Sequence, residues 1–213
     1  TQLPSWNPPQ TKPVEGPVSP WAVSRESMRK VSLELYNTAM AVTIDTGDAV
    51  ALHPKNKKPI GLRHAYLALG KTYGLPIVHE GPVLSGYAVK DGKIVLRFNS
   101  AGTGLVPARK GKLDAFGIAG KDRSWHWAEA KIEKDLIVLS SPKVQSPVAA
   151  RYAWAMNPSQ RNLLYNKEGF PASPFRTDNW PLYDPDVELI DVIKPTKPDG
   201  YKSRDWVRPS MTQ

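Results

Sequence analysis

The chain has 213 residues, 40% of them hydrophobic and 23% charged, a globular composition that excludes wholesale disorder. It contains no cysteine, which excludes disulfides, a thiolate nucleophile and cysteine metal ligands. The net charge of +9 is spread over several lysine and arginine clusters without a nucleic-acid motif, and no apolar run reaches the ~20 residues of a membrane span. We therefore expect neither a nucleic-acid partner nor a membrane span.

The chain opens with five prolines within residues 1–18, which predict an extended, Pro-rich connector. Ser19 and Pro20 then fit the N-cap and the first position of a helix. The residues that recur at helical spacing predict a face packed in the core: Trp21, Ser24, Met28 and Val31. On the opposite face we expect Arg25, Arg29 and Lys30 to point into solvent.

The run from Thr38 to Ile44 predicts a buried strand, and the polar stretch from Asp45 to Ala51 predicts the loop after it. Residues 58–73 predict a helix closed by Gly74. Its apolar residues predict a face that packs on a sheet: Leu62, Ala65, Tyr66, Leu69 and Tyr73. His53 would then lie beyond the carboxyl end of a strand, where open α/β sheets place their ligands.

From Gly81 onward the apolar pattern changes to alternation, which is typical of strands. Residues 83–89 and 93–98 predict a hairpin joined at Asp91-Gly92. Further strands are predicted at residues 113–118, 125–132, 136–139 and 148–154, so we expect a β-sandwich-like module over residues 80–156. After it we expect a loop-rich segment, 157–193, that packs back and ends in a strand at 187–193, and then an extended tail, 194–213.

Three long strings carry a family resemblance. "TIDTGDAVALHPKNKKPIGLRHAYLALGKTYG" resembles the last catalytic block of the sialate O-acetylesterase family, which are carbohydrate esterases of the SGNH-hydrolase type. "SPWAVSRESMRKVSLELYNTAMAVTID" is similar to the helix and strand before that block, and "RYAWAMNPSQRNLLYNKEGFPASPFRTDNW" to the C-terminal signature. The resemblance implies an α/β fold in which residues 19–79 form the C-terminal part of a three-layer SGNH catalytic domain, followed by the β-sandwich-like module. It also implies a secreted, periplasmic or lysosomal location.

His53 is the candidate general base, because a neutral imidazole near its working pH can take a proton from a nucleophile and return it to a leaving alcohol. The family pattern places an acid three residues before this histidine, where the chain has Val50. Asp48 is therefore the first candidate for the orienting carboxylate and Asp45 the second. A Ser-His dyad oriented by a backbone carbonyl is a further alternative.

The nucleophilic serine of the family lies in an N-terminal Gly-Gln-Ser-Asn type segment, and the chain contains no such string. Four serines before His53 do not occupy a strand-to-helix turn: Ser5, Ser19, Ser24 and Ser27. We therefore expect the nucleophile in an N-terminal half of the same enzyme, as a companion chain or segment. The isolated chain should then be inactive, with an unpaired strand edge and an exposed apolar face.

The remaining polar and aromatic candidates favour structural roles: His64, His79, His126, Trp125, Trp127, Arg151, Arg161 and Arg176. Trp125 or Trp127 stacking on a sugar is an alternative. No metal-ligand spacing or phosphate-binding loop is present, so we expect neither a metal nor a cofactor. The sequence thus predicts hydrolysis of acetyl esters on sugars, with 9-O-acetylated sialate as the implied substrate. Acetylated xylan or pectin as substrate, a non-catalytic glycan-binding module and a polyanion-binding protein are the alternatives.

Overall fold

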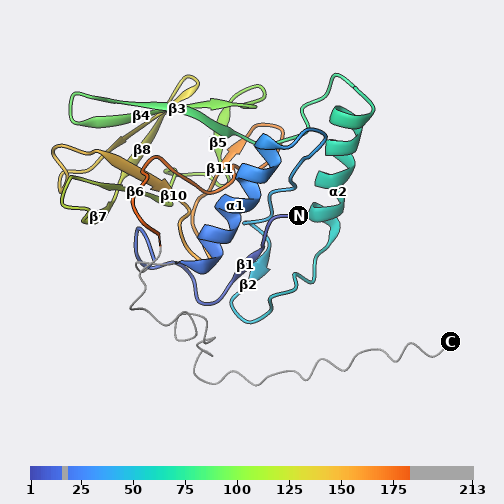
Figure 1. Cartoon of the computed structure of the whole chain (residues 1–213), viewed down its shortest axis with the longest axis horizontal. Helices are drawn as coiled ribbons and strands as arrows, with labels where there is room; N and C mark the ends of the chain where they lie inside the picture. The colour runs from blue at the N-terminus through green and yellow to red at the C-terminus, as the bar shows by residue number, and fades with distance from the viewer. Residues whose placement is uncertain (16–18, 183–213) are drawn as a thin grey trace.

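The structure is a computed structural model that describes residues 1–15 and 19–182. This part is mostly β-sheet with two α-helices, α1 (Pro20–Glu34) and α2 (Lys58–Leu67), and α2 continues into a π-helical turn, η1 (Ala68–Thr72). Neither α-helix in these ranges is long and apolar enough to cross a membrane. In Figure 1 the sheets lie on the left, α2 stands at the right, and α1 lies between them.

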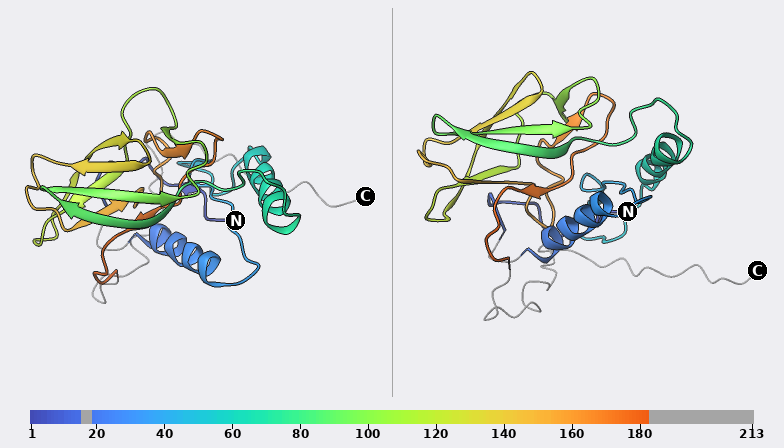
Figure 2. Two further views of the ribbon diagram at one scale, coloured as in Figure 1. Left: turned by 90° about the horizontal axis from the view of Figure 1, so that it is seen from above. Right: turned by 45° about the horizontal axis from the view of Figure 1, so that its top comes forward.

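Two antiparallel four-stranded sheets form the β-rich region. The first has the order β3 (Val83–Lys90), β4 (Lys93–Asn99), β9 (Leu136–Ser140), β8 (Glu129–Glu133), and the second has the order β12 (Phe175–Arg176), β10 (Ala149–Tyr152), β6 (Phe116–Ala119), β7 (Trp125–Trp127). One core cluster joins Ile94 and Ile137 of the first sheet to Phe116 and Tyr152 of the second. The two sheets therefore pack against each other as a sandwich, which Figure 2 shows in two further views.

The predicted hairpin is confirmed, because β3 and β4 pair in antiparallel register around Asp91 and Gly92. Both turn residues have positive φ, 50° and 69°, as a tight two-residue turn requires. The predicted strand at 125–132 instead divides into β7 and β8, which belong to different sheets. The change of sheet occurs at Ala128, whose N–H donates to the Phe116 carbonyl at 2.9 Å.

Two other strand predictions need correction. The strand predicted at 113–118 begins only at Phe116, since Ala115 has a φ of 70° that interrupts extended backbone. Residues 157–182, predicted as loop, contain β11 (Leu164–Asn166), which pairs with β5 (Leu105–Pro107), as well as β12. Strands this short carry too few residues for a visible alternation. The strand predicted at 187–193 and the tail at 194–213 lie outside the described residues.

Helix α1 begins as predicted, with Ser19 as N-cap and its hydroxyl accepting from the Ala22 N–H. The prediction of its buried face is wrong. The helix buries Arg25 and Glu26, whereas Met28 and Val31 are 36% and 48% exposed. The reason is a polar packing face, in which Arg25 binds backbone carbonyls and Glu26 forms an ion pair with Arg176 at 3.0 Å.

Helix α2 with η1 matches the predicted helix, and Gly74 follows its C-cap with a φ of 67°. The prediction that its apolar stripe packs on a sheet is wrong for the described part of the chain. Leu62, Leu69 and Tyr73 are exposed, while Arg63 and Leu67 are the buried residues of α2. The helix is turned so that Arg63 reaches Asp45, 18 residues away in the chain.

The strand predicted at 38–44 does not form a regular strand, although Ala41, Thr43 and Ile44 are buried. Burial alone produces an apolar run, but a strand also requires a partner along its backbone. Within the described ranges the regular pairing here is the short parallel pair of β1 (Ser5–Trp6) and β2 (Gly47–Asp48). Residues 1–15, predicted as a connector, bury Gln2, Asn7 and Gln10 and carry β1.

Candidate functional site

The candidate site is the segment 49–57, which joins β2 to α2 at the bottom of Figure 1 and carries His53. Two features of Gly47, its positive φ and its close approach to Ser5, fix where this segment starts. Gly47 has a φ of 88°, and a Cβ at this position would lie 2.1 Å from the carbonyl oxygen of Ser5. Only glycine therefore allows β1 and β2 to approach this closely.

Residues 2–6 hold the backbone before His53 in place. The Ser5 N–H donates to the Thr46 carbonyl at 2.8 Å, and the Ser5 hydroxyl donates to the Ile44 carbonyl at 2.5 Å. Thr43 adds a hydroxyl donated to the Gln2 carbonyl at 2.5 Å. Ser5 is fully buried and its hydroxyl proton is already used, so it has a structural role, as the sequence indicates.

The structure places His53 and Asp48 in the same loop, and both side chains are exposed. Asp48 Oδ1 accepts from the N–H groups of Val50 and Ala51, at 2.8 and 2.6 Å. Among the described residues no hydrogen bond or ion pair joins His53 to Asp48. The Asp48 carboxylate therefore stabilises the turn of this loop through Oδ1. Its other oxygen, Oδ2, would orient the imidazole only if the His53 side chain turned towards it.

Asp45 is fully engaged elsewhere. Its carboxylate accepts two bonds from the Arg63 guanidinium, both 2.6 Å long, and one from the Tyr165 hydroxyl, also 2.6 Å. Burial and the neighbouring Asp45 charge raise the pKa of Tyr165 above its ordinary value, so this hydroxyl stays a donor. Asp45 thus connects the loop before His53 to α2 and to β11.

Arg63 and Tyr165 are site-supporting residues that the sequence reasoning missed. Tyr165 lies 120 residues from Asp45, and no local pattern links positions so far apart. Arg63 also donates to the Val42 carbonyl at 2.7 Å. In the sequence, Arg63 is distinguished only by its position between Leu62 and Tyr66 of the predicted apolar stripe.

The other histidines have the local roles that the sequence favours. His64 Nε2 is hydrogen-bonded to the Thr1 hydroxyl at 2.6 Å, and His79 Nδ1 lies 3.1 Å from the Ile77 carbonyl. His126 is half-buried in β7, at the opposite end of the molecule from segment 49–57 (Figure 1). Across residues 1–15 and 19–182, no group of three or more His, Cys, Asp or Glu is placed to hold a metal ion.

The arginines considered as carboxylate binders form internal ion pairs. Arg151 binds Asp178 with two bonds of 2.9 and 2.8 Å, Arg176 binds Glu26, and Arg161 binds Asp114. The C-terminal signature therefore clamps its own segment onto α1 and β10. These contacts fit the structural ion pairs that the sequence favours.

The two tryptophans of β7 already stack on arginine. The Arg151 guanidinium lies 4.7 Å from the ring centroid of Trp125, and that of Arg161 lies 4.2 Å from the centroid of Trp127. Such cation–π contacts occupy a ring face that a sugar would need. The alternative of a glycan-binding module built on these tryptophans is therefore weakened.

Replacing Asp48 and Asp45 in turn distinguishes a residue that orients the His53 imidazole from one that holds the loop in place. We expect Asp48→Asn to lower kcat/KM for acetyl esters by more than about tenfold when the chain is assembled with its companion part, because an amide at this position orients an imidazole poorly. We expect Asp45→Asn to stay within about tenfold but to lower the free energy of unfolding by about 2 kcal/mol, since it weakens charged hydrogen bonds to Arg63. Steady-state kinetics and denaturant melts measure both, and small effects of both variants on turnover would favour a dyad oriented by a carbonyl.

The comparisons with known proteins give a likeness among solved structures. No family model matches the chain, and no curated protein matches it. Among solved structures, the chain is similar to a carbohydrate acetylesterase from Xanthomonas citri, with 40% sequence identity and a TM-score of 0.77 over 84% of the chain. The chain spans 40% of the length of that enzyme.

Proposed function

We propose that this chain is part of a carbohydrate acetylesterase and supplies its general base, His53. The observation that carries the proposal is the likeness to the Xanthomonas citri carbohydrate acetylesterase, at 40% identity over 84% of the chain. His53 supports it, because its exposed imidazole follows the parallel pair β1–β2, on a loop anchored at both ends. The resemblance to the sialate O-acetylesterases narrows the proposed substrate to an acetylated sugar, with 9-O-acetylated sialate first.

The proposed reaction is acyl transfer through a serine. His53 Nε2 or Nδ1 removes the serine proton while the serine oxygen attacks the acetyl carbonyl carbon, and the proton then passes to the sugar oxygen as the ester bond breaks. Water next attacks the acetyl-enzyme, with His53 taking its proton, and acetate leaves as the serine is restored. Donors to the developing oxyanion complete the site.

We place the serine and the oxyanion donors in another part of the enzyme. In the described residues three of the four serines weighed above have a structural contact instead, and Ser24 lies within α1 rather than at a strand-to-helix turn. Ser5 is buried with its hydroxyl donated to Ile44, Ser19 caps α1, and Ser27 donates to the Val23 carbonyl at 3.1 Å. The limited share of the Xanthomonas citri enzyme that the chain spans also supports a second part.

The test compares the chain alone with the chain produced together with the remaining part of the enzyme. We expect acetate release from p-nitrophenyl acetate and from acetylated sialate only in the second sample, because base and nucleophile must meet. Intact mass and denaturing electrophoresis show which polypeptides are present. An active, monodisperse 23.6 kDa species without a second polypeptide would contradict the division, and a serine of this chain would then be the nucleophile.

The sugar is tested on the same assembled sample. Initial rates with acetylated sialate, acetylated xylan and acetylated pectin at equal ester concentration give the ratio of kcat/KM values. A preference for sialate supports the narrower substrate. A higher kcat/KM for acetylated xylan or pectin would support the same reaction on a different sugar.

A further inference from the structure

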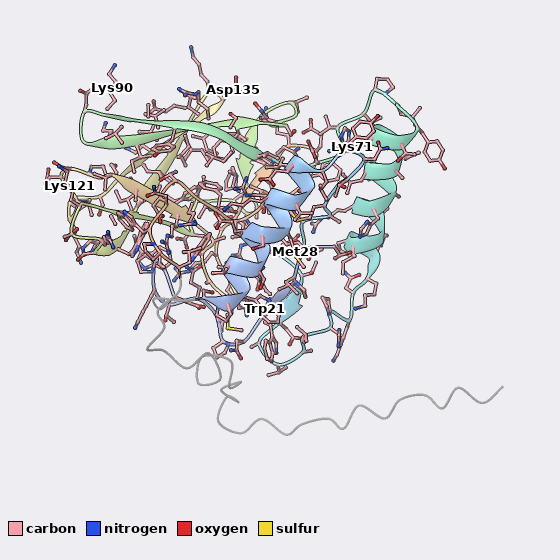
Figure 3. All side chains as sticks on the ribbon, viewed as in Figure 1. Trp21, Met28, Lys71, Lys90, Lys121 and Asp135 are labelled. Carbon is pink, nitrogen blue, oxygen red and sulfur yellow. The ribbon has the colours of Figure 1, made fainter. Side chains whose placement is uncertain are left out.

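Trp6 and Trp21 form an aromatic pair at the end of the molecule that carries the candidate catalytic loop. Their ring centroids are 5.3 Å apart, and the two ring planes are inclined by 44°. Trp6 is the last residue of β1, and Trp21 lies in the first turn of α1, which Figure 3 marks at the lower end of that helix. The segment with His53 lies at the same lower end in Figure 1. Strand β1 and helix α1 therefore bring the pair to the catalytic end of the chain.

The register of β1 and β2 fixes the place of this pair relative to the loop. Trp6 is opposite Asp48 in the parallel ladder, and neighbouring strands lie about 4.8 Å apart. The backbone turns immediately after Asp48, because its Oδ1 accepts from the N–H groups of Val50 and Ala51. His53 follows shortly after this turn. The aromatic pair and the imidazole thus belong to neighbouring segments at one edge of the fold.

Neither core packing nor arginine stacking accounts for these two indoles in the described chain. Trp6 and Trp21 are half-buried, and neither is part of the two core clusters of the described residues. Over residues 1–15 and 19–182, no guanidinium lies over either ring. The other tryptophans in these ranges each have an arginine guanidinium 4.2–5.3 Å from a ring centroid: Trp125, Trp127, Trp154 and Trp180. Trp6 and Trp21 therefore keep ring surface that a ligand can contact.

Hydrogen bonds to the backbone hold the pair in a fixed orientation. Trp21 Nε1 donates to the Pro4 carbonyl at 2.8 Å, and the backbone N–H of Trp6 donates to the Met156 carbonyl at 3.3 Å. The indole N–H of Trp6 has no acceptor among the residues that the structure describes, so this donor is left for a ligand. A surface that is ordered before its ligand arrives loses less conformational entropy on binding.

We propose that Trp6 and Trp21 form a platform for the sugar ring of the acetylated substrate, beside the loop that carries His53. This inference rests on the proposed function. The C–H groups on the apolar face of a pyranose ring pack on the electron-rich face of an indole, and Trp6 Nε1 donates to a sugar oxygen. Contacts of this kind bind the ring and leave the acetyl group free to reach the serine. The platform contributes to substrate binding, while His53 transfers the protons.

Three variants test the platform. Trp6→Leu keeps an apolar side chain but removes both the flat ring and the indole N–H, whereas Trp6→Phe keeps a smaller ring and removes the N–H. Trp127→Leu is the matched control, because Trp127 is also half-buried and is also the last residue of a short strand, β7. Circular dichroism and denaturant melts of each variant confirm that it folds.

The measurement is the ratio of kcat/KM for an acetylated sugar to kcat/KM for p-nitrophenyl acetate, on the assembled enzyme. The second ester has no sugar ring, so the ratio reports recognition of the sugar rather than ester chemistry. We expect Trp6→Leu to lower the ratio about tenfold, mainly by raising KM for the sugar ester, and Trp6→Phe to lower it less. The control should keep the ratio within about twofold. An unchanged ratio in Trp6→Leu, or an equal loss in Trp127→Leu, would overturn the proposal.

Equilibrium binding separates this inference from the esterase assignment. Calorimetric titration of the assembled His53→Ala enzyme with acetylated sialate and with acetylated xylan oligosaccharides measures sugar binding without turnover. Binding that Trp6→Leu weakens, in an enzyme whose parent releases no acetate, supports the platform and contradicts the esterase. Acetate release from sugars that Trp6→Leu leaves unchanged supports the esterase and contradicts the platform. Equal sugar binding by His53→Ala with and without Trp6→Leu would place the sugar elsewhere and overturn the proposal.

Discussion

His53→Ala is expected to lower the acetylesterase kcat/KM of the assembled enzyme by about a thousandfold or more. The reason is that the serine hydroxyl is a weak nucleophile until a base removes its proton, so loss of the base disables both the attack and the hydrolysis of the acetyl-enzyme. The fold should be unaffected, because His53 is exposed and substitutions at such positions change stability by roughly 0.5 kcal/mol or less. Initial rates with p-nitrophenyl acetate and an acetylated sugar measure the loss.

His64→Ala is the matched control for this experiment. It removes another exposed imidazole, on α2, whose hydrogen bond is to Thr1. We expect the control to keep kcat/KM within a few-fold of the parent, at roughly the level of an ordinary surface change. Turnover by His53→Ala equal to that of the control would remove the histidine from the mechanism and leave the esterase proposal with only the likeness to the Xanthomonas citri enzyme.

The local elements of the fold were predictable from the sequence, since their signals lie within a few residues. Ser19 and Pro20 identify the start of α1, and Asp91-Gly92 identifies the hairpin of β3 and β4. Each signal depends on backbone conformation at one or two positions, which single residues control. Alternate residues are buried in β4 and β9 of the first sheet, as is typical of strands with one face in a sandwich core.

The faces of the helices could not be predicted in this way. The periodic pattern identifies the apolar stripe of α1 correctly, but Arg25 and Glu26 on another face are the residues that pack inside the described chain. Several of their partners, the carbonyls of residues 155 and 156 and the side chain of Arg176, lie more than a hundred residues away in sequence. Pattern analysis assumes one buried face per helix, whereas this helix has a polar face packed within the chain and an apolar face left for another layer.

The candidate site shows the same limit. His53 stands out in the sequence because of its place after an acidic loop, but the residues that hold the loop do not. Asp45 meets Tyr165 only through the tertiary fold. The resemblance identifies the loop, and the contacts of Asp45 explain why an acid at a predicted strand end is an anchor here rather than a partner of the imidazole.

Arg25→Met is expected to lower the free energy of unfolding by about 3 kcal/mol. Arg25 is fully buried, and its guanidinium donates to the carbonyls of Leu3, Pro4, Ala155 and Met156 at 2.7–3.0 Å. Burial lowers its pKa, and Glu15 opposes this only partly, so these oxygens replace the water that the cation has lost. Methionine fills similar space but leaves carbonyls without donors.

The expected loss of unfolding free energy is limited, because two of the four carbonyls keep a second hydrogen-bond donor. The Pro4 carbonyl keeps a bond from Trp21 Nε1 at 2.8 Å, and that of Met156 keeps one from the Trp6 N–H at 3.3 Å. The carbonyls of Leu3 and Ala155 lose the side-chain donor that Arg25 provides, at roughly 1–3 kcal/mol for each buried group. Arg29→Met, one turn further along α1, is the matched control and should cost less than about 1 kcal/mol. Denaturant melts of both variants measure the two losses of unfolding free energy. Equal losses would mean that the four bonds from Arg25 to carbonyls do not hold residues 3–4 and 155–156 against α1. In that case something other than Arg25 would have to hold residues 2–6, which anchor the His53 loop, in place.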